Sequence, residues 1–180
     1  MLALIKAFWQ IVLFREGPDS LPDSRPLLFM ATAAYALTDC LIVFASEFGQ
    51  DRGELATLQI FVRMLVPAFF DIALLFISIL AAVIYFGFMG RLRQTFTALV
   101  GTAVLLQTMT LPCFILLFYE QFSALWALSI LVLVVMLLWS IALFGHILSR
   151  AIDKSFGFGV VLAMAYFFVN YQMFQLIPDF

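Results

Sequence analysis

Residues 122–148 read FSALWALSILVLVVMLLWSIALFGHIL, and this run decides the class of fold. It contains no aspartate, glutamate, lysine or arginine. At a rise of about 1.5 Å per residue, a helix of this length crosses a hydrocarbon core about 30 Å thick. A run this long and this apolar is typical of a transmembrane helix.

Four further apolar runs occupy 27–48, 64–89, 95–118 and 156–177, and the short spacers between the runs carry half of the charged residues. No ten-residue strands of alternating polarity occur, so a membrane β-barrel is not expected. Of the 180 residues, 66% are hydrophobic and 11% charged, against roughly 25% charged in soluble domains. We therefore predict an all-α fold, a polytopic transmembrane bundle of five helices within 27–180.

A separate N-terminal region, 1–26, precedes the bundle. Its first part, 2–14, is too short to span a bilayer, and Lys6 and Gln10 share one face of a helix that is otherwise apolar. We predict an uncleaved amphipathic helix lying in the headgroup layer. The second part, 15–26, contains three prolines, which rule out a continuous helix and predict a stiff connector.

The start of the second run leaves the number of spans open. Gln59 and Arg63 share one helix face within the segment 54–66, and apolar residues fill the remainder. Pro67 allows a bend because it lacks the backbone N–H of its turn. We expect a short interfacial helix that bends at Pro67 into the second span, with four or six spans as the alternatives to five.

The positions of lysine and arginine predict the orientation. With five spans, the N-terminal region and the second and fourth spacers share one side of the membrane. That side carries seven of the nine basic residues: Lys6, Arg15, Arg25, Arg91, Arg93, Arg150 and Lys154. We predict that the N-terminus is cytoplasmic and that the C-terminus lies outside.

Two aspartates lie inside the predicted spans, Asp39 in the first and Asp71 in the second. Placing an ionised aspartate at a helix centre costs roughly 2.5–3.5 kcal/mol, so such residues face partners or a cavity. Helical rise places Asp39 about 18 Å from the cytoplasmic end and Asp71 about 10 Å from the outer end, which is nearly one level. Gln107, Thr108 and Asn170 fall near the same level.

Two interpretations of this polar layer stay open. It could be a proton or ion site, or the floor of a polar cavity, in which Asp39 and Asp71 share a proton. Alternatively, it could be a hydrogen-bonded network that holds the helices together, with about 0.6–2 kcal/mol for each bond.

Motifs of enzymes are not found in the sequence. There is no G-x-S-x-G, no H-E-x-x-H and no P-loop. His146 is the only histidine, which excludes a bis-histidine haem or a histidine-based zinc triad within one chain. We expect no catalytic residues, no cofactor and no metal. The net charge of -2, without a basic run, also argues against a nucleic-acid partner.

The layout resembles the Yip (Ypt-interacting protein) family of small membrane proteins. A polar, proline-bearing N-terminal stretch is followed by five closely spaced spans, and Glu16, Gly17 and Pro18 match the acidic residue and Gly-Pro pair that members carry before the first span. The fuller Asp-Leu-x-Gly-Pro form is missing. Eukaryotic members work with Rab-type GTPases, and the short loops and few lysines here look more bacterial.

From this resemblance we expect a non-enzymatic scaffold or partner-binding subunit, embedded in the lipid bilayer of a bacterial inner membrane. A eukaryotic endomembrane is the alternative location. The partner is expected to be another membrane protein or a second copy of the chain. The rival function is a transporter or an ion- or proton-coupled subunit that uses Asp39 and Asp71.

Overall fold

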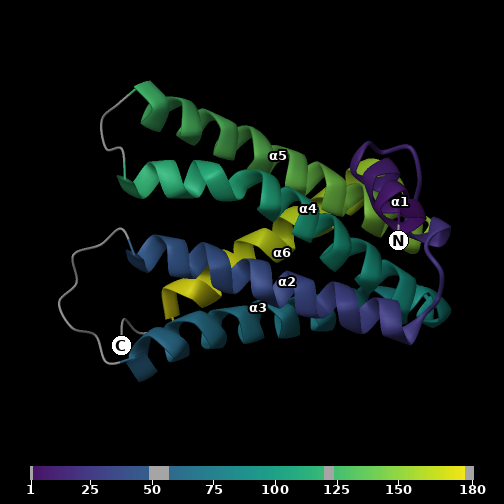
Figure 1. Cartoon of the computed structure of the whole chain (residues 1–180). Coiled ribbons are helices and arrows are strands. Elements are labelled where there is room, and N and C mark those ends of the chain that lie inside the picture. Colours follow the sequence, from purple (N-terminus) through teal and green to yellow (C-terminus); the bar gives the residue numbers. More distant parts are fainter. Residues whose placement is uncertain (1, 49–56, 120–123, 177–180) are drawn as a thin grey trace.

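A computed structural model describes residues 2–48, 57–119 and 124–176 of the chain, and all regular structure in these ranges is helical (Figure 1). The elements are α1 Leu2–Val12, the 3-10 turn η1 Pro18–Ser20, α2 Arg25–Phe48, α3 Thr57–Tyr85, the 3-10 turn η2 Met89–Arg91, α4 Leu92–Tyr119, α5 Ala124–Ala151 and α6 Phe156–Leu176. Helices α2 to α6 are each long and apolar enough to cross a membrane. The predicted all-α, five-span transmembrane class is confirmed.

The second span differs in detail from the expectation. A separate interfacial helix before Pro67 was expected, but α3 is one helix from Thr57 to Tyr85 that contains Pro67. A proline removes one backbone hydrogen bond, and membrane helices tolerate this loss because neighbouring groups replace the bond. Helix α4 likewise contains Pro112. The side chains of Gln59 and Arg63 lie outside the described part of the structure.

The helices form a bundle in which α4 is central. It packs against α2 on one side and α5 on the other, and α2 also contacts α3. Helix α6 starts beside α5 and crosses the bundle to reach α3 (Figure 1). Large apolar side chains on the outer faces, such as Phe29, Phe69 and Leu131, are exposed, as expected for lipid contact. The crossing of α6 brings residues of the last span against the second.

Serine residues define where two of these helices begin. The Ser24 hydroxyl accepts a bond from the backbone N–H of Leu27 at 3.4 Å, just before α2. The Ser155 hydroxyl accepts one from Phe158 at the start of α6 in the same way. Both are N-caps, which satisfy backbone donors that have no partner within the helix.

Helices α5 and α6 approach closely through two glycines. A Cβ atom on Gly159 would lie 2.1 Å from the carbonyl oxygen of Gly145, and one on Gly145 would lie 2.7 Å from the backbone nitrogen of Val160. Only glycine permits this backbone contact. The approach sets the start of α6 against the last turns of α5.

Helix α1 packs against the bundle as well as presenting an apolar face outwards. The Phe8 ring occupies the space beside Gly101 of α4, and Ile11 is fully buried. The indole N–H of Trp139 on α5 donates to the carbonyl oxygen of Val12 at 3.3 Å. The sequence predicted a helix in the headgroup layer, but the inner face of α1 contacts protein. Ile5 remains exposed on the outer face.

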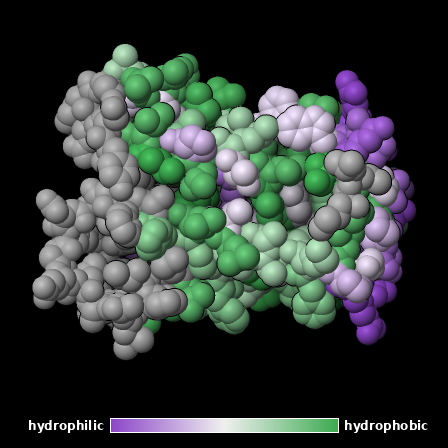
Figure 2. Space-filling model, in the orientation of Figure 1, coloured by the Kyte–Doolittle hydropathy of each residue, from purple (hydrophilic) through white to green (hydrophobic). Residues whose placement is uncertain are grey.

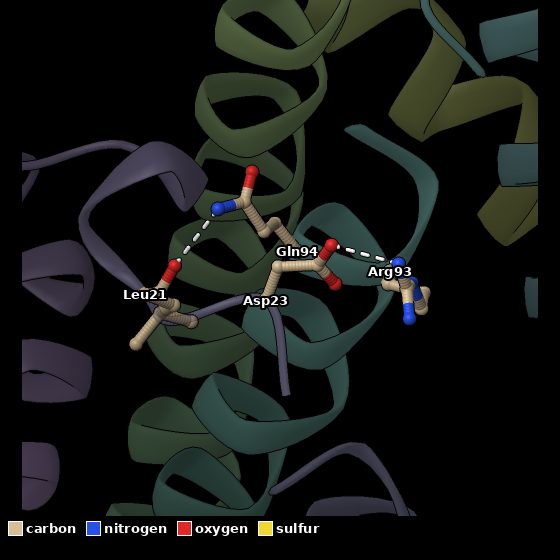
Figure 3. A network of polar contacts seen from close by, with 4 residues as sticks. All are labelled: Leu21, Asp23, Arg93 and Gln94. Carbon is tan, nitrogen blue, oxygen red and sulfur yellow. Dashed lines mark hydrogen bonds and ion pairs between the residues drawn. The ribbon is translucent and has the colours of Figure 1, made fainter. Parts of the chain in front are cut away.

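The connector, residues 15–26, forms a hydrogen bond and an ion pair with the start of α4 (Figure 3). The Gln94 side chain donates to the carbonyl oxygen of Leu21 at 3.0 Å, and Arg93 forms an ion pair of 2.8 Å with Asp23. Leu21 itself is buried. The connector is therefore part of the folded bundle and not a free linker.

A second set of hydrogen bonds joins the spacer before α4 to the end of α5 at this end of the molecule. The Arg91 guanidinium donates to the carbonyl oxygens of Arg150 and Ala151, at 3.1 and 3.2 Å. These carbonyls end α5 and have no partner within the helix. Hydrophilic residues gather at this end of the molecule, while the middle is apolar (Figure 2). We call this surface the charged end; it is formed by the exposed residues Arg15, Glu16, Asp19, Asp23, Arg25, Arg91, Arg93, Arg150, Asp153 and Lys154.

Candidate functional site

Asp71 of α3 lies at the centre of a polar cluster inside the bundle. The residue is 8% exposed, and its carboxylate accepts three hydrogen bonds. The donors are the hydroxyl of Tyr35 on α2, the hydroxyl of Tyr166 on α6 at 2.7 Å, and the side-chain amide of Asn170 on α6. These four residues are called the Asp71 cluster below. Helices α2, α3 and α6 therefore meet at one carboxylate.

Asp39 belongs to a second, smaller group that joins α2 to α4. The side-chain amide N–H of Gln107 donates to Asp39, and the Gln107 carbonyl oxygen accepts a bond from the hydroxyl of Thr38. Thr38, Asp39 and Gln107 are called the Asp39 cluster. Asp39 is half-buried, in contrast to Asp71.

Helix α2 links the two clusters. Tyr35 and Asp39 are four residues apart and so lie on the same side of the helix. Tyr35 bonds to Asp71, while Asp39 bonds to Gln107. The two aspartates thus have different hydrogen-bond partners.

Four of the five polar residues predicted to share a level belong to these clusters, and Thr108 does not. The Thr108 side chain is exposed, and its hydroxyl donates to the Val104 carbonyl oxygen of its own helix at 2.7 Å. Its neighbour Gln107 points towards α2 instead. Adjacent residues of a helix point about 100° apart, so both could not face the same partner.

Sequence reasoning missed Tyr35, Thr38 and Tyr166. A signal was present, because Tyr35 precedes Asp39 by four residues and Tyr166 precedes Asn170 by four. Residues at this spacing lie one above the other on a helix. Both tyrosines sit well inside an apolar run, where a buried hydroxyl needs a hydrogen-bond partner.

A cavity of about 560 Å³ lies beside the Asp71 cluster, lined mainly by α4, α5 and α6 and, at the cluster, also by α2 and α3. All four residues of the cluster line it, together with Gln107 and Thr110. Most of the other lining residues are apolar, among them Leu106, Phe114 and Leu133. Asp39 is not part of the lining. The cavity therefore has a polar region at one site and apolar walls elsewhere, which is the usual character of a small-molecule pocket.

The only histidine serves the packing of the connector. His146 is buried in α5, and its Nε2 lies 2.9 Å from the carbonyl oxygen of Glu16. A carbonyl only accepts, so Nε2 carries the proton. The Phe14 ring packs edge-on against the imidazole. In the described ranges, no three histidine, cysteine, aspartate or glutamate residues gather closely enough to hold a metal ion.

Comparison of the chain with protein-family models, with curated proteins and with solved structures finds no match. Function is therefore inferred from the geometry of the chain itself.

Proposed function

We propose that the chain is a small, non-enzymatic protein of a bacterial inner membrane that acts as a scaffold or partner-binding subunit. The observation that carries this proposal is the charged end. There, the connector and two spacers form a folded surface that exposes side chains of both signs, held in place by Gln94, Arg91 and His146. Surfaces that combine a fixed backbone with exposed charges are suited to steering and orienting a protein partner.

The hydrogen bonding of the aspartates supports the same proposal. Asp71 accepts three bonds from two other helices, and Asp39 accepts one from α4. Interhelical bonds of this kind stabilise a bundle by about 0.6–2 kcal/mol each. A carboxylate whose donors all come from neighbouring helices holds these helices together. A scaffold requires a stable bundle of this kind.

The Yip-like layout, a proline-bearing N-terminal stretch followed by five spans, supports the partner-binding role by analogy alone. The Gly17-Pro18 pair that carries the resemblance is buried, and Gly17 lies beside Arg150 of α5. A side chain at position 17 would meet the Asp19 side chain at 2.4 Å and Arg150 at 3.4 Å. In this proposal the pair shapes the connector, and the exposed residues around it contact the partner.

Crosslinking in intact bacterial membranes tests the proposal. The full-length chain is crosslinked, captured in mild detergent and compared with the variants Arg15→Glu and Arg25→Glu, which reverse exposed charges of the charged end. We expect a defined partner in the wild type, with several-fold weaker capture in both variants. Asp39→Asn replaces a carboxyl group inside the bundle and away from the charged end, so it serves as the control and should retain the partner.

Equal capture by the wild type and by both charge-reversal variants would contradict a partner site at the charged end. The proposed orientation, with the N-terminus cytoplasmic, has its own test. A reporter that is active only in the cytoplasm should be silent when fused after Phe180 and active when fused before Met1. The opposite pattern would place the charged end outside the cytoplasm.

The transport alternative is favoured by one observation, the contact of the cavity with Asp71. Asp39 does not line the cavity, so this alternative involves the Asp71 cluster alone. Asparagine still forms hydrogen bonds but cannot ionise. A variant Asp71→Asn that is folded but abolishes proton uptake into vesicles, measured with an internal pH dye, would favour transport over the scaffold role.

A further inference from the structure

The cavity is elongated along the helices that form it. Its lining runs from Leu99 to Leu117 on α4 and from Ile130 to Phe144 on α5. At the helical rise, these stretches correspond to about 27 and 21 Å. A space of this shape fits an extended chain better than a compact or globular ligand.

The cavity reaches the outer surface of the bundle within the apolar zone. Three of its lining residues on α5 are exposed: Ile130 by 36%, Val134 by 49% and Leu137 by 50%. All three belong to the candidate span Ala124–Ala151. A ligand that enters here comes from the bilayer, so it must be soluble in lipid.

The polar region of the cavity offers mainly hydrogen-bond acceptors. Tyr35 and Tyr166 each use their only hydroxyl proton on Asp71, so their oxygens can only accept further bonds. The Tyr166 oxygen already accepts one bond from Asn170 and keeps its second lone pair. Asn170 uses its amide nitrogen on Asp71 and on Tyr166, which leaves its carbonyl oxygen. The Asp71 carboxylate itself only accepts when ionised. Among the described residues of the lining, none is lysine, arginine or histidine.

We propose that this cavity binds a single-chain amphiphile from the bilayer whose head group donates hydrogen bonds, such as a long-chain amine or alcohol. The head lies at the Asp71 cluster, and the chain extends between α4 and α5 along the apolar walls. Fatty acids and phosphate-bearing lipids are disfavoured, because their anionic heads would meet a carboxylate and tyrosine oxygens with no cation to pair with. Binding of such an amphiphile does not depend on a protein partner at the charged end. Under the transport alternative, the amphiphile would be the transported molecule.

Photolabelling tests the site directly. The full-length protein is placed in phosphatidylcholine vesicles with a long-chain amine that carries a diazirine in its chain, and the labelled residues are mapped by mass spectrometry. We expect labels on cavity residues such as Phe114, Leu133 and Met136. Dodecylamine and dodecanol should displace the label, and dodecanoate at the same bilayer concentration should be roughly tenfold weaker, which corresponds to one hydrogen bond to a charged group.

Matched variants separate the cavity from the lipid surface. Ala103 lines the cavity, whereas Ala81 is exposed on α3. Ala103→Phe fills the space and should abolish the labelling, while Ala81→Phe should leave it unchanged. Tyr166→Phe keeps the ring and removes one acceptor, so the preference for dodecylamine over dodecanoate should narrow several-fold. This variant tests the head-group preference even if Ala103→Phe fails to fold.

Three results would overturn the inference. Labels spread evenly over exposed residues such as Phe29 and Phe69 would mean general contact with lipid. Equal competition by dodecanoate and dodecylamine would mean that the Asp71 cluster does not discriminate between head groups. If the same residues are still labelled in a folded Ala103→Phe variant, whose cavity is filled, the label reaches them from outside the cavity.

Discussion

The Tyr166 hydroxyl of α6 donates a hydrogen bond of 2.7 Å to Oδ1 of Asp71 on α3, across 95 positions of sequence. The Tyr166 ring also stacks on Phe144 of α5, with centroids 4.8 Å apart and an angle of 11° between the planes. One side chain thus connects the last span to two others, by its polar tip and its apolar face.

Tyr166→Phe should lower the free energy of unfolding by about 1–2 kcal/mol, because it removes one bond to Asp71 and keeps the ring against Phe144. Thermal unfolding in detergent measures the change. Tyr171→Phe, at an exposed position of the same helix, is the matched control and should change little. Equal destabilisation by both variants would show that the bond to Asp71 has no special weight.

Asp71→Leu should destabilise the bundle far more than Asp71→Asn. Leucine leaves the hydroxyls of Tyr35 and Tyr166 without their acceptor and removes one of two acceptors from Asn170, and each unsatisfied buried group costs about 1–3 kcal/mol. Asparagine retains one acceptor oxygen and so keeps part of the network. The midpoints of thermal unfolding of the two variants, measured side by side, provide the check. If the leucine variant were the more stable one, the cluster would cost stability, as some buried polar groups do.

Gly159→Ala should separate α5 from α6 and destabilise the protein by about 1–3 kcal/mol. The added Cβ would lie 2.1 Å from the Gly145 carbonyl oxygen, a backbone atom that cannot rotate away. Gly157→Ala is the control on the same helix, because a Cβ there meets nothing within 4 Å. It should be neutral or stabilising by up to about 1 kcal/mol. Similar melting temperatures for the two variants would contradict the close approach.

Phe8→Ala should detach α1 from the bundle, because this ring fills the space beside Gly101. Limited proteolysis of the purified protein should then cut the segment 2–14 several-fold faster. Ile5→Ala shortens an exposed residue of the same helix and should leave the cleavage rate unchanged. Rapid cleavage of the wild type would mean that α1 is not held against α4.

The spans could be predicted because length and apolar composition are local properties. The predicted run 95–118 corresponds to α4 Leu92–Tyr119, and 156–177 corresponds to α6 Phe156–Leu176. The order of the helices around α4 could not be predicted. Apolar faces are interchangeable in sequence, and the crossing of α6 depends on the fit of Gly145 against Gly159.

The candidate site was predicted in part. Helical rise placed Asp39, Asp71, Gln107 and Asn170 near one level, and the structure brings them into two clusters. Helical rise predicts the depth of a residue in the membrane but not the direction of its side chain. It therefore also selected Thr108, whose side chain faces away from both clusters. The cavity depends on gaps between side chains of five helices, and a sequence pattern carries no information about such gaps.

The crossing of α6 has a consequence for the order in which the chain is made. Tyr35 precedes Asp71 in the sequence, but the other two donors to its carboxylate, Tyr166 and Asn170, are added about 95 residues later. At a synthesis rate of about 5–20 residues per second, Asp71 is in the membrane for about 5–20 seconds with one of its three donors. A chain cut short before α6 would keep only Tyr35 of these three donors to Asp71. The polar cluster is therefore completed by α6, long after the helix that carries its carboxylate has been made.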